Sequence, residues 1–210
     1  SSAIMQNYSL TLSEGSDNHT SSLSINFIDQ DGLVRNSNYQ SVNTRLASEY
    51  KLLDNRLRIG ESFSINRWTH KFHPSGIEEM AIAQHPAIPV YDEAGGYAGG
   101  YVDVLGDKPN LIRLTDNQKN NRHAHWRLFG SAYIEVEPIT ALVLRSNFGV
   151  NYFTANHSDF VPAWREGARN VDKNELTVTN DTQFDWVWSN TINYNTDLGK
   201  HHLSALGGLE

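Results

Sequence analysis

The sequence predicts an all-β protein, an antiparallel up-and-down meander of about eight long strands that forms an arc of a large transmembrane β-barrel. Apolar and polar residues alternate with a period of two through most of the 210 residues, which is the pattern of strands with one apolar and one wet face. Several of these stretches exceed the roughly 5–6 residues typical of soluble proteins and reach the roughly 9–11 that cross a membrane. Short and long connections also alternate along the chain.

The central stretch, residues 127–153, predicts two long strands joined by a very short turn at residues 137–139. The second strand places Leu142, Leu144, Phe148, Val150 and Tyr152 on one face, with Ser146 as its one polar member, and Arg145, Asn147, Gly149 and Asn151 on the other. The first strand places Leu128, Ala132, Ile134 and Val136 opposite Arg127, Ser131 and Glu135. Each strand therefore presents one apolar face and one wet face.

Four alternating stretches precede this hairpin. Strands are expected at residues 7–13, 20–28, 39–50 and 56–68, of which the third alternates more weakly. Turn-forming residue types occupy 14–18 and 53–55, and a longer loop covers 29–38. In the fourth strand Glu61 is a polar exception on the apolar face.

A long segment, about residues 70–121, interrupts the alternation and holds four of the six prolines. Within it residues 77–84 predict a short helix. A second long loop is expected at about 156–173, then a long or broken strand at 176–195, a turn at 197–200 and a last strand at Leu203. All short turns thus lie at one end of the sheet and all long loops at the other. Outer-membrane barrels have this layout, with short periplasmic turns and long extracellular loops.

Composition excludes several classes of protein. Only 39% of residues are hydrophobic, and no stretch approaches the roughly 20 apolar residues of a membrane helix. The net charge of −7 disfavours a nucleic-acid surface, which is basic. The absence of cysteine excludes disulfides and thiolate chemistry. The first residues show no signal-peptide pattern and the last stop within an alternating pattern, so we expect a piece of a longer β-protein.

Five sequence blocks, in this order and spacing, resemble the barrel domain of SusC/RagA-type TonB-linked (TonB-dependent) outer-membrane transporters, a family typical of Bacteroidota. The blocks are NYSLTLSEGSDNHTSSLSINFIDQDGLVRNSNY (7–39), RLRIGESFSIN (56–66), HPAIPVYDEAGGYAG (85–99), RLFGSAYIEVEPITALVLRSNFGVNY (127–152) and HHLSALGGLE (201–210). The resemblance covers most of the chain, and its specificity lies in the order of the blocks rather than in any one of them.

This resemblance implies a barrel of about 22 strands, plugged by its own N-terminal domain, in the outer membrane of a Gram-negative bacterium. Such transporters pair with a SusD-like surface lipoprotein, import oligosaccharides or peptides, and are powered through TonB. Residues 1–210 are then expected to be a partial barrel domain in contact with membrane lipid, with the plug and the TonB box absent. These residues alone are not expected to transport.

The loop YDEAGGYAGGYVD (91–103) is the main candidate for substrate binding. Tyr91, Asp92, Glu93, Tyr97 and Tyr101 combine aromatic faces with carboxylates, which suits sugar stacking and hydroxyl hydrogen bonds. The alternative is a flexible loop that packs on its neighbours or on the lipoprotein.

Tryptophans at the ends of strands have two interpretations. Trp164, in the second long loop, is a further candidate for substrate contact. Trp164 and Trp68 both stand where strands meet long loops, so an aromatic girdle at the membrane interface also explains their positions. Phe184, Trp186 and Trp188 share one strand face and are expected in the girdle or against lipid.

The sequence predicts neither a metal site nor a catalytic site, and no cofactor. His70-x-x-His73 and His123-x-His125 lack a third ligand at a recognised spacing, so solvated histidines are expected. The adjacent pairs Glu78/Glu79 and Asp92/Glu93 do not show the carboxylate separation that a glycosidase needs. The chain has no GxSxG motif and no P-loop. We therefore expect no enzymatic activity.

Three functions compete on this basis. The first is part of a TonB-dependent outer-membrane transporter for oligosaccharides or peptides, and strand length and loop sorting favour it. The second is a soluble carbohydrate-binding β-sandwich, which would gain support if Glu61 and Ser146 lay in a dry core with bonded partners. The third is a glycan-active enzyme that uses the loop carboxylates.

Overall fold

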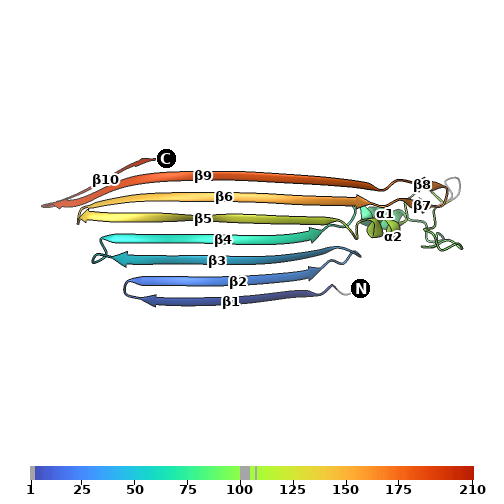
Figure 1. Ribbon diagram of the computed structural model, residues 1–210, viewed down its shortest axis with the longest axis horizontal. Coiled ribbons are helices and arrows are strands. Elements are labelled where there is room, and N and C mark those ends of the chain that lie inside the picture. Colours follow the sequence, from blue (N-terminus) through green and yellow to red (C-terminus); the bar gives the residue numbers. More distant parts are fainter. Residues whose placement is uncertain (1–2, 100–104, 107) are drawn as a thin grey trace.

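Eight strands form one open antiparallel sheet in which every strand pairs with its neighbours along the chain (Figure 1). The computed structural model describes residues 3–99, 105–106 and 108–210. The strands are β1 Met5–Ser16, β2 His19–Asp31, β3 Asn38–Leu52, β4 Leu57–Lys71, β5 Arg122–Ile139, β6 Leu142–Val161, β9 Glu175–Leu198 and β10 His201–Leu209. The predicted meander of about eight long strands is confirmed.

The connections are sorted between the two ends of the sheet. Residues 17–18, 53–56, 140–141 and 199–200 make tight turns at one end, the left end in Figure 1. Residues 32–37, 72–121 and 162–174 connect the strands at the other end. We call these the turn end and the loop end. The predicted alternation of short and long connections is confirmed.

Two short helices and a small hairpin stand beyond the loop end of β4, β5 and β6 (Figure 1). They are α1 Ile77–Ala83, α2 Leu111–Asn117, β7 Trp164–Glu166 and β8 Arg169–Val171. The helix expected within residues 77–84 is present as α1, whereas α2 and the hairpin were not predicted. We call the described parts of 72–121 and 162–174 the loop assembly.

Among the described residues no helix has the length and apolar character that crossing a membrane requires.

Several predicted boundaries are wrong because the strands run further than expected; β1, for example, continues to Ser16 within the turn expected at residues 14–18. The central turn lies at residues 140–141 instead of 137–139, because β5 continues through a bulge between Val136 and Ile139. Pro138 fits there because a bulge leaves a residue outside the ladder, and the Glu137 N–H still donates to the Arg56 carbonyl at 2.7 Å. The second long loop begins at residue 162 instead of about 156, because β6 runs on to Val161.

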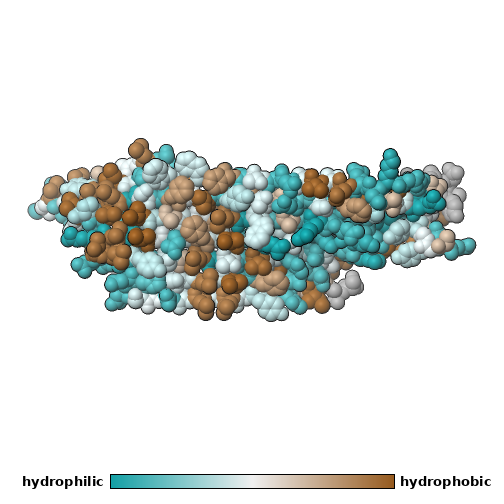
Figure 2. Space-filling model, in the orientation of Figure 1, coloured by the Kyte–Doolittle hydropathy of each residue, from teal (hydrophilic) through white to brown (hydrophobic). Residues whose placement is uncertain are grey.

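One face of the sheet is apolar and uncovered. Phe148, Trp186 and Phe184 lie on it with 46%, 62% and 60% of their surface exposed. Among the described residues only Ile77, Ala98 and Ala155 are buried apolar side chains. Figure 2 shows apolar side chains gathered over the turn end and the middle of the sheet, and mostly polar ones at the loop end. The molecule therefore has almost no core of its own.

Across β4, β5, β6 and β9 the apolar face forms a band with a defined edge toward the loop end. In β6 the band runs from Leu142 to Tyr152, a length that matches the roughly 9–11 residues of a membrane-crossing strand. The register places Ile65, Leu128, Tyr152 and Phe184 in one row at its loop-end edge. On the same face the next rows carry Arg67, Thr69, Trp126, Ala124, Thr154, Asn156, Thr182 and Asn180. We call the rows from the tight turns up to this edge the apolar band.

Two polar residues of the apolar band have side-chain partners. The Ser48 hydroxyl donates a short hydrogen bond to Glu61, and the Trp188 indole N–H donates to Ser146 Oγ at 2.9 Å. Both pairs lie on the uncovered face and not in a dry core, so they do not favour the soluble sandwich.

Candidate functional site

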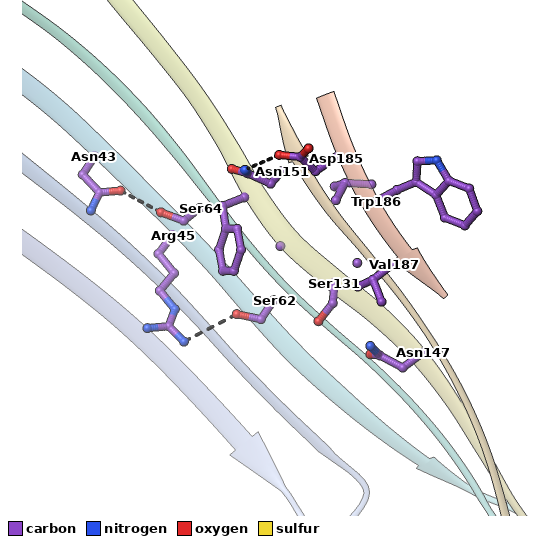
Figure 3. A pocket seen from close by; sticks show the side chains of 14 residues that line it. Asn43, Arg45, Ser62, Ser64, Ser131, Asn147, Asn151, Asp185, Trp186 and Val187 are labelled. Atoms are coloured by element: carbon purple, nitrogen blue, oxygen red, sulfur yellow. Dashed lines mark hydrogen bonds between the residues drawn. The ribbon is translucent and has the colours of Figure 1, made fainter. Parts of the chain in front are cut away.

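The face opposite the apolar band is polar and hollow. A groove of about 520 Å³ crosses β3, β4, β5, β6 and β9 on this face (Figure 3). Apolar Phe129 and Val187 line it together with a set of polar residues: Asn43, Arg45, Ser62, Ser64, Ser131, Asn147, Asn151 and Asp185. Figure 3 shows these side chains on one side of bending strands, whereas the Trp186 indole points away from them. We call this face the concave face.

Hydrogen bonds between strands hold the groove side chains in place. The Ser64 hydroxyl donates to Asn43 Oδ1 at 3.0 Å, and the Asn151 amide donates to Asp185 Oδ2 at 3.1 Å. The Arg127 Nε–H donates to Asn151 Oδ1 at 2.9 Å. Because these partners come from different strands, the groove presents an ordered set of donors and acceptors.

Charged pairs continue the polar surface toward the turn end. Glu135 accepts from Arg58 at 3.0 Å and from Arg145 at 3.4 Å. The Arg145 guanidinium also lies 3.8 Å from the centre of the Tyr133 ring, whose hydroxyl donates to Glu49 at 2.5 Å. Such a surface suits a water-filled passage and not contact with lipid.

The residues predicted from 91–103 lie in the loop assembly. Tyr91 and Tyr97 are brought together, with ring centroids 5.9 Å apart and planes inclined by 29°. The Asp92 carboxylate accepts from the backbone N–H groups of Ala94 at 3.0 Å and Gly96 at 2.7 Å, so it shapes the turn between the two rings. Glu93 is exposed. Tyr101 lies outside the described residues.

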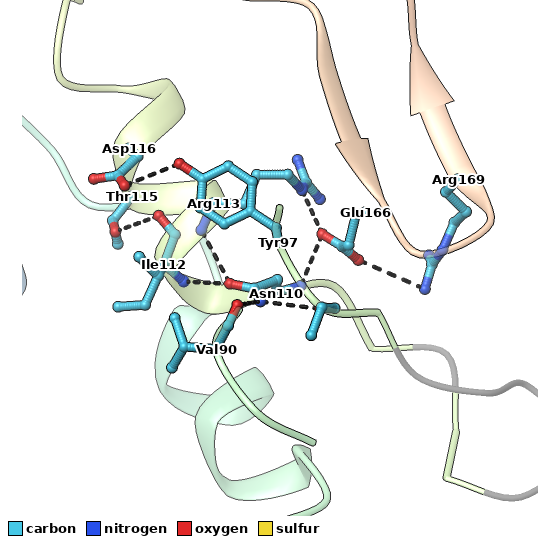
Figure 4. A network of polar contacts seen from close by, with 10 residues as sticks. Val90, Tyr97, Asn110, Ile112, Arg113, Thr115, Asp116, Glu166 and Arg169 are labelled. Carbon is cyan, nitrogen blue, oxygen red and sulfur yellow. Dashed lines mark hydrogen bonds and ion pairs between the residues drawn. The ribbon is translucent and has the colours of Figure 1, made fainter. Parts of the chain in front are cut away.

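A buried ion pair joins the two long loops (Figure 4). Glu166, at the end of β7, is only 1% exposed and accepts from the Arg113 Nε–H and from the Asn110 backbone N–H. The Arg113 guanidinium lies 3.7 Å from the centre of the Trp164 ring. Trp164 is therefore part of this junction and not of an interface girdle at the edge of the sheet.

Asn110 organises the junction from the start of α2. Its side-chain oxygen accepts from the N–H groups of Ile112 and Arg113 at 3.1 Å, which is an N-cap. Its amide group donates to the carbonyls of Val90 at 2.7 Å and Ala98 at 3.0 Å. One side chain thus fixes both the helix and the backbone on either side of Tyr91 and Tyr97.

A second contact ties the loop assembly to the β2–β3 loop. Asp116 accepts from the Tyr97 hydroxyl at 3.0 Å and from the Asn36 amide at 3.3 Å, and Arg35 lies 3.3 Å away. Burial, together with the bond to Asp116, raises the pKa of Tyr97 above its ordinary value of 10.0. The phenol therefore remains a neutral donor throughout the physiological range.

Asn110, Arg113, Asp116 and Glu166 were not predicted from the sequence. Asn110 carried a signal, because Asn directly before the largely apolar stretch LIRL is a typical N-cap pattern. The Arg113–Glu166 pair joins residues 53 positions apart, and no local pattern marks such a pair.

The prediction for Trp68 is wrong, and that for the histidines needs correction. The register pairs Trp68 with His125 on the concave face, so Trp68 does not belong to an outward girdle. His125 is 7% exposed instead of solvated. In the part of the chain that the structure describes, no group of three or more His, Cys, Asp or Glu side chains is arranged to hold a metal ion.

Comparisons with known proteins show that the chain is similar to TonB-dependent receptors. It is 27% identical to TonB-dependent receptor P26 of Formosa agariphila over 216 residues, which cover 98% of this chain and 21% of that protein. It is 26% identical to TonB-dependent receptor P3 of the same organism, over 97% of this chain and 21% of that protein. The chain thus spans about a fifth of the length of these curated relatives. No family model matches.

Solved structures show the same fold. The RagAB peptide importer in its closed-closed state matches with a TM-score of 0.78 at 19% identity, over 96% of this chain and 23% of the other. The RagAB peptide transporter matches with a TM-score of 0.77 at 18% identity, over 97% of this chain and 24% of the other. The predicted resemblance to TonB-dependent transporters and the predicted barrel arc are both confirmed.

Proposed function

We propose that these residues form part of the barrel wall of a TonB-dependent outer-membrane transporter that imports oligosaccharides or peptides. The observation that carries this proposal is the one-layer sheet, whose exposed apolar band lies opposite the polar concave face. A band of that height suits the lipid of a Gram-negative outer membrane, and the concave face suits a water-filled lumen. The likeness to TonB-dependent receptors supports TonB as the source of energy.

In this proposal the loop assembly lies at the extracellular mouth. It contributes to the vestibule and to the surface on which a SusD-like lipoprotein closes. TonB-driven movement of a plug then opens the lumen, and substrate passes along the concave face. Two features support the assignment: the loop assembly is held by buried polar contacts, and it stands beyond the loop end of β4, β5 and β6 (Figure 1).

Within the vestibule the proposal assigns substrate contact to Tyr91 and Glu93. Tyr91 is 51% exposed beside Tyr97, and the Glu93 side chain is exposed next to it. Asp92, Tyr97 and Trp164 are positioning residues, because their polar groups or ring faces already contact the loop assembly. An aromatic face next to a carboxylate suits a sugar ring or a peptide side chain.

The barrel-wall assignment is tested by one charge placed on either face of the same strand. Phe148→Arg puts a guanidinium into the middle of the apolar band, where it costs about 2–4 kcal/mol in lipid. Asn147→Arg, one residue away, puts the same charge on the concave face and is expected to be tolerated. The measurement is the amount of folded protein in outer-membrane fractions. Equal tolerance of both variants would contradict the proposal.

Substrate contact is tested separately. Tyr91→Ala removes an exposed stacking surface, which is worth about 0.5–1.5 kcal/mol, so uptake at limiting substrate is expected to fall by roughly 2- to 13-fold. Leu33→Ala, a matched change of an exposed apolar side chain in the β2–β3 loop, is expected to leave uptake unchanged. Uptake of oligosaccharides and of peptides is measured in cells with equal amounts of protein in the membrane. Unchanged uptake by the Tyr91 variant would remove it from the site.

A further inference from the structure

Four histidines from three strands meet on the concave face near the loop end. Their ring centroids form a closed circuit, with His70–His123 at 5.3 Å, His70–His125 at 4.9 Å, His125–His157 at 5.1 Å and His123–His157 at 4.7 Å. The Trp68 ring stacks on His125 at 4.8 Å with planes 6° apart. We call the four imidazoles the histidine layer. Neither the proposed substrate contacts nor the proposed barrel wall requires four clustered imidazoles at this place.

The ring nitrogens of the layer have few partners. His123 Nε2 contacts Asp159 Oδ1 at 2.8 Å. Both ring nitrogens of His125, and Nε2 of His157, are buried without a hydrogen-bond partner among the described residues. A buried nitrogen without a partner is costly, and adding a proton there would cost more because the new charge is also desolvated.

Charged side chains from several strands surround the layer: Asp31 and Lys71 line a groove with His70, and Arg122 lines a second groove with His70 and His123. On the concave face β3 contributes Tyr39 opposite His70, β5 contributes Arg127 in the next row, and β9 contributes Asp181 opposite Ala155. Beyond β4, His73 lies 3.5 Å from Glu78 and is paired outside the layer. In the described part of the chain, Asp159 of β6 is the one carboxylate that forms a hydrogen bond with the layer. Its single negative charge can offset one imidazolium but not several.

The layer lies outside the apolar band. His70 is five residues beyond Ile65, the last band residue of β4, which is roughly 16 Å along a strand. There, burial first and then the neighbouring His125, His123 and His157 lower the pKa of His70 from 6.5 to about 4. Burial and the neighbours His157 and His123 likewise lower the pKa of His125. Both rings are therefore neutral at pH 7.

The layer also lies beside the bases of the loop assembly. His70 is the residue before the end of β4, and His123 is the second residue of β5, so both ends of segment 72–121 leave the sheet beside the layer. His157 is four residues before the end of β6, from which segment 162–174 leaves. Separation of these rings would loosen both long segments at once.

We propose that the histidine layer is a proton-sensitive clasp, which holds the loop assembly on the sheet while His70 and His125 are neutral and releases it when they are protonated. Protonation places like charges about 5 Å apart with one bonded carboxylate to offset them. In the released state water solvates the rings, and the distance between them increases. The inference concerns movement of the loop assembly in acid and does not depend on which substrate is carried.

The sign of the effect follows from proton linkage. We call the state with the loop assembly held the closed state, and the released state the open state. A histidine with an ordinary pKa near 6.5 in the open state and about 4 in the closed state takes up a proton on opening. The closed state is fully favoured above pH 6.5 and loses this advantage as the pH falls from 6.5 toward 4. For His70 alone, the opening equilibrium rises by about 30-fold between pH 8 and pH 5.

The test measures hydrogen exchange of the protein as its cell makes it, in outer-membrane vesicles at pH 8 and pH 5, corrected for the intrinsic pH dependence of exchange. Peptides from the ends of segment 72–121 are expected to exchange about 30-fold faster at pH 5, and the β3–β4 turn at residues 53–56 serves as the internal reference. If the exchange rates of the loop bases and of this turn changed equally between pH 8 and pH 5, the proposal would be overturned before any variant is made.

Two substitutions identify the source of the effect. His70→Phe keeps an aromatic ring in the stack but cannot take up a proton, so the rise at pH 5 is expected to fall to less than about a third of its original size. His202→Gln, at an exposed histidine paired with Asp197 at the turn end, is expected to leave the rise intact. If His70→Phe fails to fold, His157→Gln replaces it. A full rise that persists in the variant would also overturn the proposal.

Discussion

Gly130 shows how a single residue sets the distance between two strands. A methyl group at this position of β5 would press into the Ser62 carbonyl oxygen and lie 2.8 Å from the Phe63 Cα, both in the backbone of β4. Backbone atoms cannot rotate away as a side chain can. Gly130 therefore allows β4 and β5 to approach each other within the apolar band.

Gly130→Ala is expected to destabilise the protein by about 1–3 kcal/mol, because the two strands must separate to relieve the overlap. Gly207→Ala in β10 is the matched control, since nothing lies within 4 Å of the added methyl group, and it is expected to change stability by less than about 0.5 kcal/mol. Urea unfolding in detergent micelles measures both. A Gly130 variant as stable as the control would show that the strands adjust without cost.

Single residues also show what the sequence could predict. The faces of β4 follow from its alternation, because the period of two is local, and Phe63 and Ile65 lie where it places them. The same alternation puts Trp68 on the concave face, so the girdle interpretation overlooked a signal that was present. The spacing of His123 and His125 places both on one face of a strand, because the period of a strand is two. Their neighbours His70 and His157 depend on the register of β4 and β6, which no single strand encodes.

At the scale of elements, the loop assembly depends on the junction between α2 and β7. Arg113 is 5% exposed and Glu166 1% exposed, so removal of one partner leaves a buried charge uncompensated. Such a loss typically costs about 3–5 kcal/mol, far more than that of a surface pair. Segments 72–121 and 162–174 are therefore expected to unfold together.

Glu166→Gln is expected to make both long segments sensitive to protease, with the sheet unchanged, because Arg113 loses its counter-charge. The control is Glu135→Gln, which removes a carboxylate that half-exposed Arg58 and Arg145 contact on the concave face, and it is expected to leave loop protection intact. Limited proteolysis of vesicles from their outer surface measures the rates of cleavage. If both segments stayed protected from protease in the Glu166 variant, Asn110 and the Tyr97–Asp116 hydrogen bond would be sufficient to hold the loop assembly.

An element can be predicted from the sequence when the residues that determine it are adjacent in the chain. Strands and tight turns could be predicted because alternation and turn-forming residues are adjacent in sequence. The central turn was misplaced by about two residues, because Pro138 is a turn former that here occupies a bulge. Hairpin β7–β8 and the placement of α2 could not be predicted, because contacts between distant segments, such as Arg113 with Glu166, hold them.

The whole molecule exposes far more surface than a compact protein of its size. Its accessible area is 14437 Å², whereas a folded monomer of 23.7 kDa exposes about 9,800 Å². Much of the excess is the apolar band, and β1 and β10 each pair on one side only. In water such a sheet would associate through its apolar face and its free edges.

The 210-residue chain on its own is therefore expected to be β-rich and soluble as a defined species only in detergent. Sedimentation and circular dichroism, with and without detergent micelles, measure this directly. Large aggregates in plain buffer that become a single β-rich species in micelles would show that the exposed face requires an apolar solvent. A monodisperse monomer that unfolds cooperatively in plain buffer would mean that the chain covers this face itself, and it would contradict the assignment of the apolar band to lipid.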